Sequence, residues 1–239
     1  MVDLMLRRRQ MMQAQGGGGG TIPWETNGLI FCLDGLTHDA TSWTDLIGNV
    51  KYSPTNNPTY SWDNGLKFSS SSANNSYFSA SATAFKLPST ATIEAVVTFA
   101  ANPSGNYSIL SFNKDDGTTT YGFIFCKPGS GNAQVEVSKD SLKKTSLATT
   151  DIHSIVGTIS SSAQTGLYVN GVKKTTNGDY STVSGGLVNF LGVYNTSSGK
   201  PMGGVTGTIH SVRVYNRVLT QAEIQSNYAV DVSRYNISV

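Results

Sequence analysis

A strand and a helix start that follow one another near the C-terminus constrain the fold more than any other feature. Residues 208–215 are rich in β-branched and aromatic side chains, which is typical of a strand. The apolar residues Ile209, Val212 and Val214 do not keep the strict alternation of a regular strand. A bulge near Ser211 would reconcile their spacing, so we expect one there.

The helix that follows this strand is marked by two pairs of residues. Thr220 and Glu223 form a capping box, in which each side chain satisfies a free backbone N–H of the first helical turn. Leu219 and Ile224 stand at the positions of a hydrophobic staple and should pack together. The pattern predicts one short helix over residues 221–229 that closes the domain.

Three stretches of the sequence carry a family resemblance. The closing stretch contains, in order, Val-Arg-Val-Tyr-Asn-Arg, Leu-Thr, Ala-Glu-Ile and Asn-Tyr. Residues 29–49 contain a strand and a Trp-x-Asp-Leu-x-Gly-Asn turn, and residues 167–173 read Leu-Tyr-Val-Asn-Gly-Val-Lys, with an Asn-Gly hairpin turn. Together they resemble laminin-G-like domains of the concanavalin A-like superfamily over residues 24–231. The resemblance implies a β-sandwich that is often used to recognise sugars or proteins.

The rest of the chain reads as short strands joined by turns rich in Gly, Pro, Asn and Asp. Residues 92–99 alternate most clearly. In the first strand we expect Leu29, Phe31 and Leu33 on one face, and Ile30 and Cys32 on the other. The sequence therefore predicts an all-β fold, a two-sheet antiparallel β-sandwich (jelly roll) with one short C-terminal helix and a non-globular N-terminal arm.

The N-terminal segment differs from the rest of the chain. It combines three consecutive arginines with apolar residues, and residues 16–20 form a flexible glycine linker. We expect residues 1–20 to be an anchoring arm with its linker, and residues 21–239 to be one laminin-G/concanavalin A-like domain. A disordered tail is the alternative. The residues expected to anchor the arm to a partner are Leu4, Met5, Arg7, Arg8, Arg9, Met11 and Met12.

Charge and targeting signals exclude several classes of partner. The chain has 17 Lys+Arg and 15 Asp+Glu residues, and the arm accounts for the whole net charge of +2. We therefore expect no nucleic-acid partner and no membrane partner. No signal peptide is recognisable, so we expect action inside the cell, export by another route, or release with a virus. Cys32 and Cys126 both stand in apolar runs and are expected to be reduced core residues.

Aromatic residues offer candidates for glycan binding, because exposed rings can stack on sugar faces. Tyr60 and Trp62 lie among Pro and Asn residues and are the surface candidates. Trp43 belongs to the turn motif of the resemblance and is expected to be a packed anchor instead.

Carboxylates offer two candidate metal sites, each with a structural alternative. Asp115 and Asp116 stand at a hairpin tip, where they could hold a calcium ion, although an ordinary Asp-Gly turn explains them as well. No other cofactor is expected. A second group, in the loop after the first strand, lacks recognisable ligand spacing and is expected to be turn structure. Its members are Asp34, His38, Asp39 and Asp45.

The sequence shows no catalytic pattern. Glycoside hydrolysis needs two carboxylates that face the scissile bond, but Glu94 and Glu136 each stand alone in their strands. His153 and His210 are isolated and are expected to be structural. We therefore expect a protein that is not an enzyme.

Two classes of function remain. The first is a structural protein of the virion, made in the host cytoplasm without a signal peptide. In it a lectin-like domain is displayed on a phage head or tail, as a decoration or fibre protein, and binds glycans or the host surface. The arm would contact capsid or tail proteins, and it resembles the N-termini of structural proteins of phages that infect Bacteroidetes. Such a protein would be present in many copies and could be a homo-oligomer. The alternative is a bacterial cell-surface carbohydrate-binding module.

Overall fold

The computed structural model describes most of the chain beyond its N-terminal segment. The described residues are 22–55, 58–68, 77–80, 86–99, 107–113, 120–128, 132–138, 144–148, 150–160, 163–174, 187–191, 193–195, 201–204 and 206–239. The arm with its seven expected anchoring residues, and also Asp115 and Asp116, therefore lie outside the described residues.

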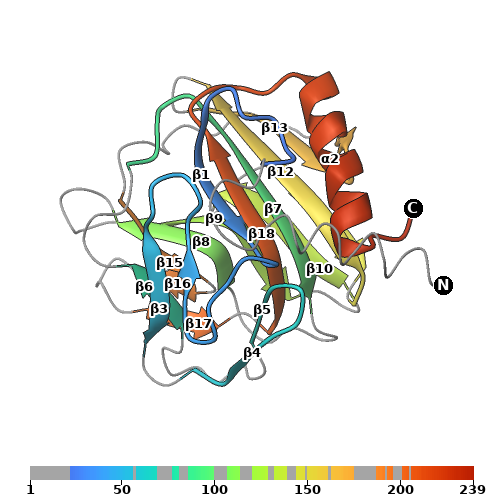
Figure 1. Ribbon diagram of the computed structural model, residues 1–239. Coiled ribbons are helices and arrows are strands. Elements are labelled where there is room, and N and C mark those ends of the chain that lie inside the picture. The colour runs from blue at the N-terminus through green and yellow to red at the C-terminus, as the bar shows by residue number, and fades with distance from the viewer. Residues whose placement is uncertain are drawn as a thin grey trace.

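Two antiparallel sheets pack face to face, as the sequence predicts (Figure 1). The first, sheet A, runs in the order β14 (Val172–Lys173), β13 (Ala163–Val169), β12 (Ile152–Ser160), β7 (Ala91–Phe99), β18 (Gly207–Tyr215), β5 (Leu66–Phe68) and β4 (Tyr60–Trp62), and β1 (Leu29–Asp34) also pairs with β18. The second, sheet B, runs in the order β11 (Lys144–Ala148), β10 (Asn132–Ser138), β9 (Thr120–Pro128), β8 (Tyr107–Asn113), β15 (Leu187–Leu191), β6 (Tyr77–Ala80), β3 (Lys51–Thr55) and β2 (Trp43–Thr44). A further two-stranded sheet joins β16 (Val193–Asn195) to β17 (Pro201–Gly204).

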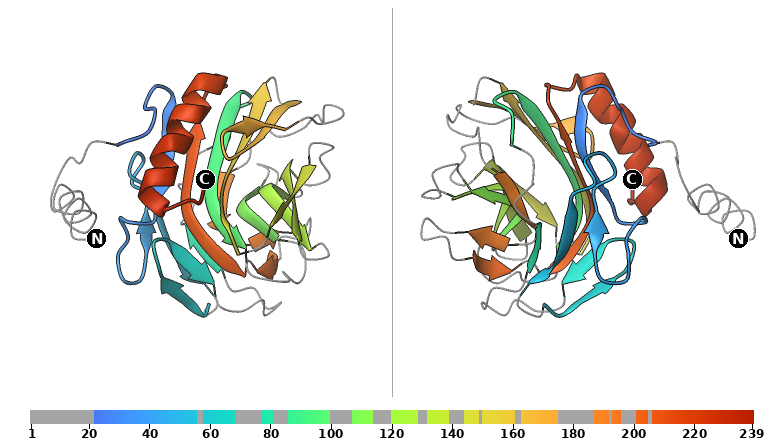
Figure 2. Two further views of the ribbon diagram at one scale, coloured as in Figure 1. Left: turned by 90° about the vertical axis from the view of Figure 1, so that its right-hand side faces the viewer. Right: turned by 60° about the vertical axis from the view of Figure 1, so that its left-hand side comes forward.

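Helix α2 (Gln221–Tyr235) covers the outer face of sheet A, so the domain has three layers (Figure 2). The capping box is formed as predicted, with Thr220 and Glu223 each bonded to the other's backbone N–H. The helix runs six residues further than expected, because it continues to Tyr235 and ends only where Asn236 adopts a left-handed conformation (φ 55°). Within the described residues, no helix is long and apolar enough to cross a bilayer.

Strand β18 contains the predicted bulge. Its pairing with β7 shifts register between Ile209 and Ser211, and Ile209, Val212 and Val214 all join the core between the two sheets. The hairpin at Asn170 and Gly171 is also formed, with positive φ at both residues.

Strand β1 departs from the expected alternation. Its pairing with β18 shifts register between Leu29 and Phe31, so the two residues point to opposite faces of sheet A. Leu29 packs with Cys32 on the side of α2, whereas Ile30 packs against the core between the sheets with Phe31. The expectation that Leu29 and Phe31 share a face was wrong because the shift reverses which residues point inward.

Two apolar clusters hold the layers together. The larger one lies between the sheets and includes Phe31, Trp43 and Phe78. The smaller one lies between sheet A and α2 and includes Trp24 and Ile224. Leu219, the other residue of the predicted staple, joins Ile224 in this outer cluster, which fixes the angle at which the chain enters the helix.

Candidate functional site

Strand β4 forms one edge of sheet A and carries both aromatic residues predicted for glycan binding. Tyr60 pairs with Phe68, and Trp62 pairs with Leu66. Both rings are half-buried and pack against the core between the sheets, while Ser61 between them is exposed. Because β4 is an edge strand, its inward side chains reach the rim of the sandwich.

Four other aromatic side chains contact Trp62 at this rim. Tyr60 meets it edge to face with 6.1 Å between ring centroids, and Phe78 and Trp43 do so at 5.9 and 5.8 Å. His38 lies parallel to the indole, with ring centroids 4.0 Å apart and an interplanar angle of 6°. We call these five residues the edge cluster.

The edge cluster is graded from buried to exposed. Trp43 is fully buried and donates its Nε1–H to the carbonyl of Asp34 at 2.9 Å, which confirms it as a packed anchor. Trp62 is half-buried and donates its Nε1–H to the carbonyl of Ala40 at 2.9 Å. His38 is exposed. The edge cluster therefore extends from the buried ring of Trp43 to the solvent-exposed imidazole ring of His38.

The loop that carries His38 is closed on itself by short polar contacts. His38 forms an isolated β-bridge with Trp43. The backbone N–H of Asp39 donates to the carbonyl of Ser42 at 2.9 Å, and the Ser42 hydroxyl donates to the Asp39 carboxylate at 2.9 Å. Together with the bond from Trp62 to Ala40, these contacts hold the loop in place before any ligand arrives.

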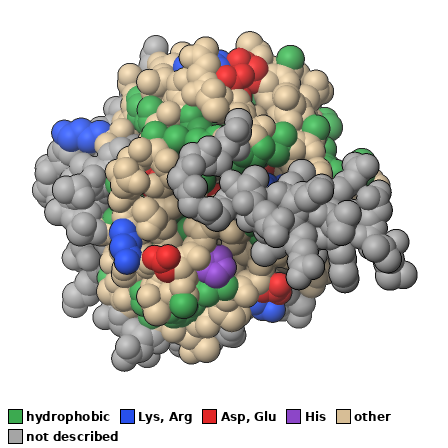
Figure 3. All heavy atoms as spheres, in the orientation of Figure 1, with side chains coloured by type: hydrophobic (Ala, Val, Ile, Leu, Met, Phe, Trp, Pro, Cys, Tyr) green, Lys and Arg blue, Asp and Glu red, His purple; other side chains and the backbone are tan. Residues whose placement is uncertain are grey.

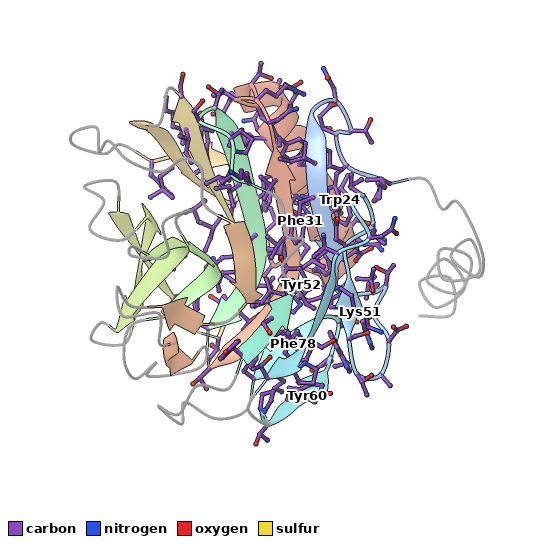
Figure 4. The ribbon with its side chains drawn as sticks, turned by 90° about the vertical axis from the view of Figure 1, so that its left-hand side faces the viewer. Trp24, Phe31, Lys51, Tyr52, Tyr60 and Phe78 are labelled. Carbon is purple, nitrogen blue, oxygen red and sulfur yellow. The ribbon has the colours of Figure 1, made fainter. Side chains whose placement is uncertain are left out.

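Figure 4 places Tyr60 beside Phe78 at the lower end of the domain, well away from Trp24. Their ring centroids are 4.9 Å apart at 89°. At the loop of the cluster, Lys51 on β3 lies 3.9 Å from the Asp39 carboxylate, and both side chains are largely exposed. Figure 3, which shows one face of the molecule, shows its positive and negative side chains scattered singly or in small groups, without a large area of one sign. Such a surface suits a neutral ligand better than a highly charged one.

The structure thus brings Tyr60 and Trp62 together as neighbours, and it adds His38, which sequence reasoning had assigned to turn structure. The local sequence gives no signal for this contact. His38 lies in the loop after β1 and Trp62 lies on β4, so the two rings meet only in the folded domain. Asp39 and Asp45 of the loop group serve as turn structure. Asp34 is instead the last residue of β1, and its carboxylate pairs with α2.

Asp45 and Asp34 brace backbone and buried partners and do not point to a metal. Asp45 accepts hydrogen bonds from the backbone N–H of Cys32 at 2.6 Å and of Gly48 at 2.5 Å. Burial nevertheless raises the pKa of Asp45. Asp34 accepts a bond from the Tyr235 hydroxyl at 2.9 Å and forms an ion pair with Arg234. Among the described residues, no group of three or more potential ligands could hold a metal ion.

Glu94, which stands alone in its strand, is buried under α2 on the outer side of sheet A. Its Oε2 accepts bonds from Arg213 Nε at 2.8 Å and from Asn227 Nδ2 at 2.9 Å. Arg213 in turn binds both oxygens of Asp231 at 2.8 Å, and Trp24 Nε1 donates to Asp231 at 2.8 Å. We call Trp24, Glu94, Arg213, Asn227 and Asp231 the outer ionic cluster.

The outer ionic cluster is structural, not solvent-facing. Glu94, Arg213 and Asp231 are all fully buried. Burial raises the pKa of Glu94, and Arg213 only partly offsets this. Burial also lowers the pKa of Arg213, but Asp231 and Glu94 outweigh it and leave that pKa above its ordinary value. A substrate has no access to Glu94 in this arrangement. The side chain of Glu136 lies outside the described residues.

Two histidines and Cys32 behave as structural residues, as expected. His210 donates its Nδ1–H to the carbonyl of Asn64 at 2.8 Å, its Nε2 lies 2.9 Å from the Thr98 hydroxyl, and burial lowers its pKa. His153 donates its Nε2–H to the carbonyl of Ala148 at 2.9 Å. Cys32 is a buried free thiol, and burial raises its pKa to about 12. The side chain of Cys126 lies outside the described residues.

Comparison with known proteins connects this fold to sugar-related proteins. Residues 72–225 match the family described as the concanavalin A-like lectin/glucanases superfamily. A mutant Trypanosoma rangeli sialidase displaying trans-sialidase activity has a similar structure (TM-score 0.64, 17% identity), and the match covers 98% of this chain and 38% of the sialidase. Domain 4 of an extracellular arabinanase from Geobacillus stearothermophilus, solved with arabinotriose, is also similar (TM-score 0.54, 14% identity, 85% of this chain and 100% of that domain).

At 14–17% sequence identity, the similarity to these two structures is a similarity of fold. A search of curated protein sequences finds no match. The chain spans little more than a third of the sialidase chain that it matches, 38%.

Proposed function

Because this chain belongs to the concanavalin A-like lectin/glucanases superfamily, we propose that it is a non-enzymatic glycan-binding module whose sugar site is the edge cluster. One observation carries the proposal: aromatic rings extend from the core to solvent on a loop that is already held in place. Aromatic surfaces bordered by a few fixed polar groups are the usual makeup of a small-ligand site. The arabinanase domain, which has the same fold, was solved with an oligosaccharide.

Tryptophan fluorescence gives a direct test of the site. Of the three tryptophans, Trp24 and Trp43 are buried and Trp62 is half-buried. Sugar binding at the edge cluster should therefore change the emission of Trp62 in the full-length protein, after a glycan array has identified binding glycans. A Trp62→Phe variant should lose that change, whereas Trp24→Phe should keep it. A binding glycan that leaves the emission unchanged would place the site elsewhere.

We propose that the module binds glycans without cleaving them. Glu94 supports this, because it is neutralised by Arg213 beneath α2 and is inaccessible to a sugar. Incubation of the purified protein with a glycan panel should release no reducing sugar. Hydrolysis that disappears in a Glu136→Gln or Glu94→Gln variant would contradict the proposal.

We expect the edge cluster to bind glycans without a metal ion. Calcium binding at Asp115 and Asp116 is a separate proposal for the loop that holds these two residues. Treatment with EDTA should then leave the affinity for any binding glycan unchanged. Loss of binding that calcium restores would assign the ion to the sugar site.

The N-terminal segment supports display of this module on a virion. Arginines present several donors that suit bidentate bonds to carboxylates, and methionines adapt to irregular apolar surfaces. From its composition, we expect the glycine linker to let the domain reorient relative to an anchored arm. We therefore propose a phage structural protein, anchored to capsid or tail proteins in many copies. Mass spectrometry should detect it in purified virions; finding it in cell-envelope fractions instead would favour the bacterial carbohydrate-binding module.

A further inference from the structure

We infer that the exposed face of His38 and its Nε2 atom form the contact surface for a neutral pyranose sugar. This inference rests on the proposed glycan-binding function and assigns the part of the edge cluster that touches the ligand. Neither the family match nor the similar structures assign a role to this residue.

The stacking geometry identifies His38 as the accessible ring. One face of the Trp62 indole is covered by the parallel imidazole at 4.0 Å. The three other rings stand against Trp62 at 81–83° and are packed toward the core. A sugar that approaches the cluster from the side of the stack therefore meets His38 first, with Trp62 behind it. The indole holds the imidazole plane fixed, so stacking on it costs little side-chain entropy.

The hydrogen bonds of His38 determine what its edge can offer. Nδ1 lies 2.9 Å from the carbonyl oxygen of Asp39, which can only accept, so Nδ1 carries the proton. In the neutral ring Nε2 is then an acceptor, and within the described part of the chain no group bonds to it. A sugar hydroxyl that reaches past the edge of the ring can donate to Nε2, while the sugar's C–H face lies against the exposed face of the imidazole.

The nearby charges favour a neutral ligand. Asp39 and Lys51 lie 3.9 Å apart and balance each other's charge. The carboxylate can accept from hydroxyls and the ammonium can donate to them. An anionic sugar that approaches Lys51 also approaches the carboxylate of Asp39. Repulsion by this carboxylate then offsets the attraction to the ammonium group. A pyranose, which combines hydroxyls with an apolar C–H face, fits both the ring and this pair.

Nuclear magnetic resonance of the histidine side chains tests the inference on the full-length protein. The probes are methyl β-galactopyranoside and methyl α-mannopyranoside at millimolar concentrations, with mannitol as an acyclic polyol that lacks the ring's apolar face. The chain has three histidines, and His153 and His210 are buried. The resonances that disappear in the spectrum of the His38→Ala variant therefore belong to the exposed histidine, His38. We expect a pyranoside to shift the Nε2 resonance of His38, and mannitol to leave it unchanged.

Variants separate the two contributions of His38. His38→Ala should weaken pyranoside binding about tenfold or more, because both stacking and the acceptor are lost. His38→Phe should lose less, since it keeps an aromatic face over Trp62. Lys67→Ala, which removes an exposed lysine from β5, is the matched surface control and should bind as the unchanged protein does.

The outcomes distinguish the inference from the function on which it rests. If His38→Ala and His38→Phe are folded by circular dichroism and bind glycans with unchanged affinity, the inference is wrong and the glycan-binding proposal stands. A stronger response to a sialoside than to the neutral pyranosides would overturn the neutral-ligand assignment. If the protein binds no glycan on an array and no pyranoside in solution, both fail.

Discussion

Arg213 lies fully buried between sheet A and α2, and its guanidinium is shared by two carboxylates. A buried charge of this kind is tolerated only while its partners remain in place, because each ion has lost its hydration. Arg213 also packs over the ring of Trp24, 4.5 Å from its centroid. The residue therefore connects Trp24, β18 and α2 to one another.

Replacement of Arg213 by Met should destabilise the fold strongly. The change leaves Glu94 and Asp231 buried without their cation, which costs about 3–5 kcal/mol in comparable pairs. Urea unfolding would measure the loss. The triple variant Arg213→Met, Glu94→Gln, Asp231→Asn should recover part of it, since no buried charge is then left unpaired. An unchanged unfolding midpoint for the single variant would show that the cluster does not hold the outer layer.

Glu223 should make stability depend on pH in the acid range. Hydrogen bonds from Arg217 and then from the Thr220 backbone lower the pKa of Glu223 from 4.5 to about 2. Because the folded pKa is below the unfolded one, the stabilisation is fully present above pH 4.5 and is lost as the pH falls toward about 2. Thermal melts over this range should fall more steeply for the natural protein than for Glu223→Gln. Equal slopes would contradict this role.

At the scale of elements, the cap of α2 offers a measurable test. Thr220 donates its backbone N–H to Glu223 at 2.7 Å, and the Glu223 N–H donates to the Thr220 hydroxyl at 3.3 Å. Thr220→Ala removes the second bond and should lower the free energy of unfolding by about 0.5–2 kcal/mol. Thr220→Ser, which keeps the hydroxyl, is the control and should lose much less. Equal stability of Thr220→Ala and the natural protein would show that the cap is redundant.

The elements that could be predicted from the sequence are those set by local chemistry. The capping box lies within four residues, and the β18 bulge follows from apolar spacing alone, so both are visible before folding. The face reversal in β1 was not, because it is created by pairing with β18, far away in the chain. The stack of His38 on Trp62 and the burial of Glu94 could not be predicted for the same reason, because both depend on residues that are distant in the chain. A lone polar residue in a sequence does not reveal which partner will neutralise or cover it.

At the scale of the whole molecule, Ile22, Trp24 and Glu25 contact the outer layer, and all three lie beyond residue 20. Trp24 bonds to Asp231, and the backbone N–H of Glu25 donates to Asn227 at 2.9 Å. Deletion of residues 1–20 should therefore leave the circular dichroism and the melting temperature nearly unchanged, while it abolishes incorporation into particles. Full occupancy of the truncated protein on virions would show that the arm does not anchor it. A large drop in melting temperature would show that the arm belongs to the fold.

The bond between Trp24 and Asp231 also decides how the domain would carry mechanical load. Tension on the N-terminal segment enters the domain at Trp24 and passes into α2 and the middle of sheet A through Asp231 and Arg213. Tyr60, which marks the edge cluster, lies at the other end of the domain (Figure 4). A pull at Trp24 would therefore load its contacts with α2 before it reaches His38, which lies further along the chain beyond β1. An adhesive contact made there would keep its shape under a load that already strains the tether.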